Sequence, residues 1–190
     1  KEHDAAPEFS SEFSFGGLTV TGNIFTVNDA ASYFSWVVLK PFGPGHFLQG
    51  LSVTGNTFKS LNGTTERVET VDDSIAALDF ALTRNVVFAA NTFNGIGQNT
   101  INPVTLQFDQ LSAATTWTLE VSGYLPFGGR AREVTSVVTE GAIENASSEA
   151  VFAMPYVTTE SGAGNNEVAL TWPEPVKGRV HVTARVDRPI

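Results

Sequence analysis

A short pattern of apolar and polar positions returns along the first two thirds of the chain. Residues 18–25 (LTVTGNIF), 51–58 (LSVTGNTF) and 86–93 (VVFAANTF) each alternate apolar and polar side chains before an Asn. These segments begin 33 and 35 residues apart, and residues 119–125 (LEVSGYL) repeat the strand 33 residues later without the Asn. Alternation predicts half-buried strands. A near-constant period of this length predicts repeats that each bury one face on the next.

The Asn and Phe positions within the repeat have a structural explanation. Asn tolerates a left-handed bend and binds local backbone, so successive bends predict a ladder of side-chain amides. The aromatic residue two positions later predicts a column of rings inside the repeats. The predicted ladder residues are Asn23, Asn56, Asn91, Phe25, Phe58 and Phe93.

A further strand is predicted in each repeat after the bend. The predicted strands are residues 36–42, 75–80 and 104–108, aligned on Leu39, Leu78 and Leu106. The middle strand has an alternative, because Asp72 and Asp73 before an Ala-rich stretch are also typical of a capped helix. The loop ahead of it is the longest, with the excess in residues 59–73. Insertions in repeat proteins map to loops that often bind ligands.

The period stops after residue 127, and longer alternating segments follow. We therefore expect an all-β fold in which residues 1–127 form parallel coils and residues 128–190 form a small antiparallel β domain. Because the first repeat begins by about residue 13, an unpaired sheet edge would be left there, and we expect further coils before residue 1. A folded cap formed by residues 1–12 is the alternative.

Composition narrows the classes of partner. The net charge is −9 and the isoelectric point about 4.7, which argues against binding nucleic acid. No apolar run is long enough to span a membrane. The chain has no Cys, so it offers neither disulfides nor thiolate chemistry.

Repeats with a Gly-Asn-x-Phe bend resemble the right-handed parallel β-helix proteins, over residues 13–125. That group includes pectate-lyase-like and polygalacturonase-like enzymes and the tailspikes of bacterial viruses. Coils followed by a terminal β unit are more similar to the tailspikes. The resemblance implies a homotrimer, a surface that binds or cuts a polysaccharide, and a location outside the cell or on a phage or prophage particle. The catalytic motifs of the two enzyme groups are not found in this sequence.

Two acidic residues form the best catalytic candidate. In the strand alignment Asp79 and Asp109 lie on neighbouring coils, offset by two residues on the same outward face, about 7–8 Å apart. Inverting glycosidases hold their carboxyl groups about 6.5–9.5 Å apart, so this geometry fits. The alternative is structural, because Lys40 occupies the slot of Asp79 one coil earlier and would form an ordinary surface ion pair with it.

The remaining candidates concern binding. Exposed aromatic faces stack on sugar rings, and the long loop supplies charged groups beside them. The candidate carbohydrate-binding residues are Tyr33, Glu66, Arg67, Glu69 and Tyr124. Asp72 and Asp73 could bind Ca²⁺ through their carboxylate oxygens, without other cofactors. We expect recognition of a surface polysaccharide, with trimerisation and capping by the terminal domain. The alternatives are a polysaccharide-degrading enzyme whose active site lies largely upstream and a purely structural assembly module.

Overall fold

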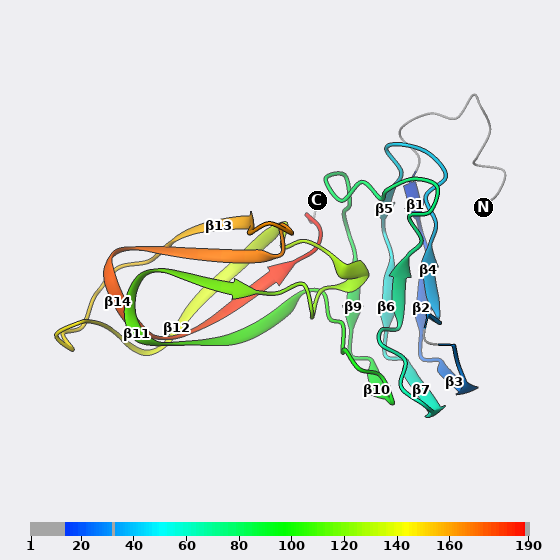
Figure 1. Cartoon of the computed structure of the whole chain (residues 1–190), viewed down its shortest axis with the longest axis horizontal. Helices are drawn as coiled ribbons and strands as arrows, with labels where there is room; N and C mark the ends of the chain where they lie inside the picture. The colour runs from blue at the N-terminus through cyan, green and yellow to red at the C-terminus, as the bar shows by residue number, and fades with distance from the viewer. Residues whose placement is uncertain (1–13, 32, 189–190) are drawn as a thin grey trace.

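Strands dominate the part of the chain that the computed structural model describes, residues 14–31 and 33–188 (Figure 1). Short parallel sheets of two or three strands make up the first part, and one antiparallel sheet makes up the second. Within the described residues the helical element is a single 3-10 turn, η2 (Pro126–Gly128), and no helix is long or apolar enough to span a membrane. The all-β prediction is confirmed. The alternative cap at residues 1–12 lies outside the described residues.

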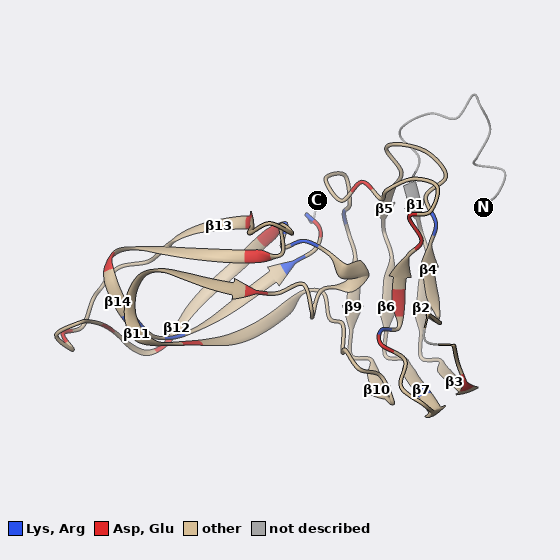
Figure 2. Ribbon diagram, in the orientation of Figure 1, with Lys and Arg blue, Asp and Glu red and all other residues tan. Residues whose placement is uncertain are grey.

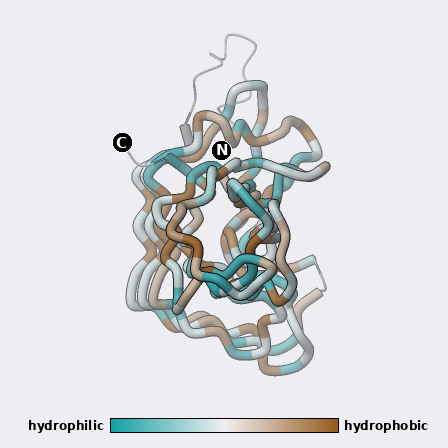
Figure 3. Tube along the Cα trace, turned by 90° about the vertical axis from the view of Figure 1, so that its left-hand side faces the viewer, coloured by the Kyte–Doolittle hydropathy of each residue, from teal (hydrophilic) through white to brown (hydrophobic). Residues whose placement is uncertain are grey.

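The repeats pair with one another in sequence order. The parallel partners are β1 (Ser14–Gly16) with β5 (Phe47–Gln49), β2 (Thr19–Thr21) with β6 (Ser52–Thr54) and β9 (Val87–Ala89), β3 (Ile24–Asp29) with β7 (Thr57–Asn62) and β10 (Thr92–Asn94), and β4 (Val37–Leu39) with β8 (Glu69–Val71). Figure 3 looks along the direction of pairing and shows the traces of the repeats overlapping. The structure therefore pairs the repeated segment of residues 51–58 with residues 18–25, and residues 86–93 with residues 51–58.

The amides of the bends form a ladder of hydrogen bonds. The Nδ2 of Asn23 donates to the Oδ1 of Asn56 at 3.2 Å, and the Nδ2 of Asn56 donates to the Oδ1 of Asn91 at 3.1 Å. The backbone N–H groups of Asn23 and Asn56 donate to the same two oxygens. Each amide thus satisfies polar groups at a corner of the backbone where the strand ladder is interrupted.

A column of aromatic rings lies beside the amide ladder. The ring of Phe58 stacks between those of Phe25 and Phe93, with centroids 5.1 and 6.0 Å apart. The left-handed residue at each bend is the one before the Asn: φ is +68° at Gly22, +65° at Gly55 and +55° at Ala90. Glycine suits that conformation because it has no Cβ. The Asn residues therefore serve the ladder, and the preceding residue makes the turn.

The alignment of the further strands is corrected by the structure. Leu39 pairs with Val71, because strand β8 lies inside the long loop of residues 59–73. The segment around Leu78 is neither strand nor helix, and Leu106 lies opposite Val182 in the antiparallel sheet. The loop contains a short buried stretch at Val68 and Glu69, and this stretch, not the Ala-rich segment, reaches the neighbouring repeat.

The second part of the chain is built around strand β14 (Glu167–Arg185). Strand β11 (Val104–Glu120) pairs antiparallel with it over both halves, β12 (Glu133–Asn145) pairs with the second half, and β13 (Tyr156–Ser161) pairs with the first. The antiparallel sheet therefore begins at Val104, ahead of the boundary predicted after residue 127. We call residues 104–188 the terminal unit.

The long strands of the terminal unit bend near their middle. The pairing of β11 with β14 shifts between Gln110 and Thr116, opposite Pro173 and Pro175, which have no N–H to donate. Trp117 holds this bend, because its indole Nε1 donates to the carbonyls of Ala114 and Val176, both at 3.1 Å. The bent sheet encloses a core that includes Trp117 and Trp172, whose rings lie 4.9 Å apart.

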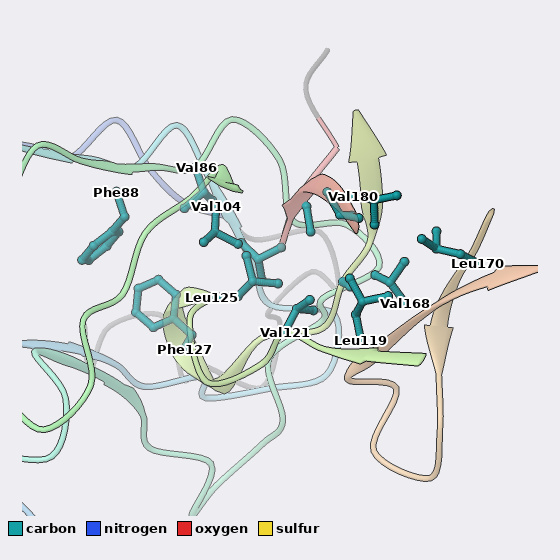
Figure 4. Close-up of a cluster of buried hydrophobic side chains, with 14 of the residues drawn as sticks. Val86, Phe88, Val104, Leu119, Val121, Leu125, Phe127, Val168, Leu170 and Val180 are labelled. Atoms are coloured by element: carbon teal, nitrogen blue, oxygen red, sulfur yellow. The ribbon is translucent and has the colours of Figure 1, made fainter. Parts of the chain in front are cut away.

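Two polar side chains satisfy the outer edge of the third repeat at β9. Asn102 forms an antiparallel bridge with Phe88, and its Nδ2 donates to the carbonyl of Val86 at 2.7 Å. The buried carboxylate of Asp187 accepts the N–H of Val86 at 2.9 Å and the Nδ2 of Asn102 at 2.9 Å. Arg185 balances this carboxylate through two hydrogen bonds of 3.1 Å. The apolar core continues through this closure, from Phe88 to Leu119 and Leu170 (Figure 4).

The aromatic column provides a test of the packing. Phe58 is fully buried between two rings, so Phe58→Ala should lower the free energy of unfolding by about 3–5 kcal/mol, since it leaves a cavity. Leu61→Ala on the same strand is the control, because Leu61 is exposed and its change should stay within about 0.5 kcal/mol. Urea denaturation of both variants measures the difference, and equal losses would contradict the packing.

Candidate functional site

Three adjoining hollows lie where the first two repeats meet η2. The first, of about 210 Å³, is lined by Tyr33, Phe34, Ser35, Glu66, Arg67, Glu69 and Thr70. The second, of about 360 Å³, shares the last three of these residues and adds Asp73, Phe127 and Arg130. The third, of about 590 Å³, shares Leu78, Phe80 and Arg130 with the second and extends to Pro44. Because neighbouring hollows share lining residues, they lie next to one another, and we call the three together the junction groove.

Aromatic side chains lie at intervals along the junction groove. Tyr33 at one end is 88 % exposed. Further along, the guanidinium carbon of Arg130 lies 5.9 Å from the centre of the Phe80 ring, a cation–π arrangement that leaves the exposed guanidinium able to bind a ligand. The groove thus combines flat apolar surfaces with charged groups at their edges.

The wall between the first two hollows is held by Arg67. Its Nε donates to Glu69 at 2.9 Å, its Nη1 donates to Gln98 at 2.8 Å, and its Nη2 donates to the carbonyl of Leu125. A guanidinium that already donates to three acceptors is held in one position. Arg67 therefore shapes the groove and links the second repeat to the segment just before η2 in the terminal unit.

Glu69 is a fully buried carboxylate under the groove. Its Oε1 accepts the N–H of Phe127 at 3.1 Å as well as the bond from Arg67, and its Oε2 accepts the hydroxyl of Thr100 at 2.8 Å. Burial raises the pKa of Glu69 above its ordinary value of 4.5, while Arg67 and these donors act in the opposite direction. With its lone pairs engaged, this carboxylate is a structural support of the groove and a poor hydrogen-bond acceptor for a ligand.

The predicted carbohydrate-binding residues separate into two groups. The structure brings Tyr33, Glu66, Arg67 and Glu69 together around the first hollow. Tyr124 lies outside the lining of the three hollows, and its backbone carbonyl accepts the N–H of Ile101 at 2.8 Å.

The predicted calcium ligands do not converge. Asp72 pairs with Lys40 at 2.7 Å and accepts the N–H of Ser74, and these hydrogen bonds lower the pKa of Asp72 from 3.8 to about 2. Asp73 instead lines the second hollow. No group of three or more His, Cys, Asp or Glu side chains that could hold a metal ion is found in residues 14–31 and 33–188.

The predicted catalytic pair rested on the strand alignment that the structure corrects. Asp79 accepts the N–H groups of Ala81 and Leu82 in a turn beside the third hollow. Asp109 lies on β11 in the terminal unit, where Arg179 binds it and lowers its pKa. The two carboxylates line different hollows, so they do not form an acid–base pair on adjacent repeats. Lys40, the suggested partner of Asp79, pairs with Asp72.

Asp109 belongs to a chain of charged groups across three strands of the terminal unit. Arg179 on β14 contacts both Asp109 and Glu140, and Glu140 also lies 2.7 Å from the Nε2 of His181. Hydrogen bonds from His181 and Arg179 lower the pKa of Glu140. These are exposed cross-strand pairs, which contribute little to stability.

Sequence reasoning missed the far wall of the groove. Phe127 and Arg130 come from the turn at η2 inside the terminal unit, and Glu69 holds this turn against the second repeat by accepting the N–H of Phe127. The Gly-Gly pair at residues 128–129 marks a turn in the sequence, but nothing in the sequence indicates what the turn packs against.

Comparison with family models, with curated proteins and with solved structures gives no match to this chain.

The burial of Glu69 predicts how the free energy of unfolding depends on pH. Because burial raises the folded-state pKa of Glu69, its contribution to stability is present below its unfolded value near 4.5 and is lost as the pH rises through the folded pKa. The unfolding free energy of the wild type minus that of Glu69→Gln should therefore fall as the pH rises from acidic to neutral. Urea denaturation across this range measures it, with Glu66→Gln at the exposed neighbour as control. A difference that grows with pH would contradict the assignment.

Proposed function

We propose that this chain binds a polysaccharide along the junction groove. The observation that carries the proposal is the adjacency of the three hollows, whose linings include exposed Tyr33, the Phe80–Arg130 pair and the carboxylates of Glu66 and Asp73. A chain of sugar rings alternates flat apolar faces with hydroxyl edges. Aromatic faces and charged hydrogen-bonding groups at intervals complement both parts of such a ligand.

The charge of the chain is consistent with this ligand class. A net charge of −9 disfavours phosphate-rich polymers, whereas an uncharged or weakly charged glycan is not repelled. In the groove itself the cations Arg67 and Arg130 accompany the carboxylates of Glu69 and Asp73, so the second hollow is close to neutral. Binding would then depend on stacking and hydrogen bonds more than on net charge.

We further propose that the three repeats are coils of a right-handed parallel β-helix of the tailspike type. Two features support this: the in-register parallel pairing of the repeats and the Asn and Phe ladders that run through all three. A protein of this type would meet its polysaccharide outside the cell, on a bacterial surface or as part of a phage or prophage particle.

Assembly as a homotrimer through the terminal unit is the second part of this proposal. Phe152 is 98 % exposed, and Met154 and Tyr156 beside it are exposed as well. Phe152 and Met154 line a mainly apolar hollow of about 370 Å³ between β12 and the segment that leads to β13. Large apolar side chains gathered in this way are typical of surfaces that bind other protein surfaces.

Glycan binding tests the groove. A panel of bacterial surface polysaccharides is screened first, and a short oligosaccharide of a bound species is then titrated by calorimetry. Tyr33→Ala should weaken binding about twofold to twelvefold, because it removes about 0.5–1.5 kcal/mol of stacking. Tyr156→Ala is the control, since it removes a tyrosine that is 75 % exposed and lies outside the lining of the three hollows. Unchanged affinity in Tyr33→Ala would refute the groove, and release of new reducing ends would favour the degrading enzyme.

The oligomeric state tests the terminal surface. Light scattering after size exclusion should give a mass three times higher for the wild type than for Phe152→Ser, because the polar replacement removes the largest exposed apolar side chain. Leu111→Ser on the bend of β11 is the control, since Leu111 is also exposed but lies outside the hollow at Phe152. Equal masses for the wild type and Phe152→Ser would exclude this interface.

A further inference from the structure

Asn is followed by Gly at two places in the chain, residues 62–63 and 94–95. In such a pair the backbone nitrogen of the Gly can attack the side-chain carbonyl carbon of the Asn and close a five-membered succinimide ring. Gly favours this attack because it has no Cβ and its backbone adopts many conformations. The reaction therefore depends on how firmly the fold holds each Gly, and the two pairs differ in this respect.

The first pair lies in an open turn at the end of β7. Asn62 and Gly63 are both exposed, and φ of Gly63 is +89°. Apart from its chain neighbours, no atom lies within 4 Å of the position that a Cβ would take at Gly63. Its N–H has no hydrogen-bond acceptor among the residues that the structure describes, and its carbonyl accepts the hydroxyl of Ser60 at 3.1 Å. One exposed side-chain hydrogen bond therefore restrains Gly63, and its nitrogen is able to attack.

The second pair is held firmly against the second repeat. A Cβ at Gly95 would lie 2.4 Å from the carbonyl oxygen of Ser60, so the backbone at this residue is closely packed. The carbonyl of Gly95 accepts the N–H of Thr65 at 3.1 Å, and the next residue, Ile96, forms a parallel bridge with Thr65. Ring closure requires the peptide after the Asn to rotate, and these contacts oppose that rotation at Gly95.

Within residues 14–31 and 33–188, the side chain of Asn62 makes one hydrogen bond. Its Nδ2 donates to the Oδ1 of Asn28 at 3.0 Å, and both side chains are exposed. A hydrogen bond between exposed groups is exchanged for bonds to water at little cost in free energy. The carbonyl carbon of Asn62 is therefore accessible both to the nitrogen of Gly63 and to water.

We propose that Asn62 is a site of spontaneous deamidation, whose product loosens the contact between the first two repeats. The bond from the Gly63 nitrogen to Cγ of Asn62 forms, and the bond from Cγ to Nδ2 breaks. The amide nitrogen leaves as ammonia with the proton that the Gly63 N–H gives up. One water then opens the ring: attack at Cγ gives aspartate, and attack at the main-chain carbonyl carbon gives isoaspartate. This inference is independent of the polysaccharide proposal.

The product is mismatched to its neighbours on β3. Asn62 is in register with Asp29, and Figure 2 shows this acidic residue at the end of β3 beside the uncharged end of β7. An aspartate at position 62 would face Asp29 as a like charge, which is unfavourable between paired strands. It would also lack the N–H that Asn62 donates to Asn28. Isoaspartate adds a methylene carbon to the backbone, which shifts the pairing at the strand end.

The two Asn-Gly pairs provide an internal comparison for the test. The whole chain is incubated at mildly alkaline pH, folded or in guanidinium chloride, and tandem mass spectrometry of a protease digest measures conversion at each Asn. In the folded chain Asn62 should convert about tenfold faster than Asn94, because the restraint on Gly95 raises the barrier there by about 1.4 kcal/mol. In guanidinium chloride the two rates should become similar, because this restraint is lost. Equal rates in the folded chain, or conversion at Asn62 only after unfolding, would overturn the proposal.

The structural consequence is tested by comparing fresh and incubated samples of two variants. Asn62→Gln keeps the amide but lengthens the side chain, so that the ring closes far more slowly. On incubation the melting temperature of the wild type should fall by about 2–4 °C, whereas that of Asn62→Gln should stay unchanged. Asn94→Gln is the matched control and should lose as much as the wild type. An incubated Asn62→Gln sample that loses as much as the wild type would overturn the proposal.

Discussion

The arrangement of the molecule depends on how the backbone of the third repeat is satisfied at its outer edge. A sheet edge that is covered by other protein must find hydrogen-bond partners, because an unpaired buried N–H or carbonyl costs about 1–3 kcal/mol. Asn102 and Asp187 supply these partners with two side chains, and Arg185 balances the charge. Asp187 is 101 positions from Val86 and 85 positions from Asn102 in the sequence, and it binds both. These contacts anchor the terminal unit to the repeats.

A second buried carboxylate performs a similar role on the other side of the junction. Glu69 receives Arg67 from its own repeat, Thr100 from the segment after the third repeat and Phe127 from η2. A buried carboxylate is costly unless its oxygens are satisfied, so these contacts depend on one another. Glu69, Arg67 and Phe127 also line the second hollow, so this part of the junction groove depends on the docking of η2.

The two ends of the repeats differ in how their backbone groups are satisfied. The third repeat is closed by polar side chains with a continuous apolar core behind them (Figure 4). Among the residues that the structure describes, the N–H groups of Thr19 and Ile24 and the side-chain oxygen of Asn23 in the first repeat have no hydrogen-bond partner. Between these ends, the long loop of the second repeat and the turn η2 create the groove in which aromatic and charged side chains alternate.

The sequence by itself determined the repeats, their register and the amide and aromatic ladders, because these depend on a local pattern that recurs at one period. It also indicated Tyr33, Glu66, Arg67 and Glu69 as candidate binding residues, since a loop insertion and a candidate exposed aromatic residue can be recognised without a fold. Only the tertiary structure decided that β8 lies inside the long loop, that Val104–Glu120 joins the antiparallel sheet, and that Asp79 and Asp109 are apart. The physical reason is that strand pairing is non-local: an alternating segment can pair with any edge within reach, and burial and hydrogen bonding in the assembled molecule select the partner.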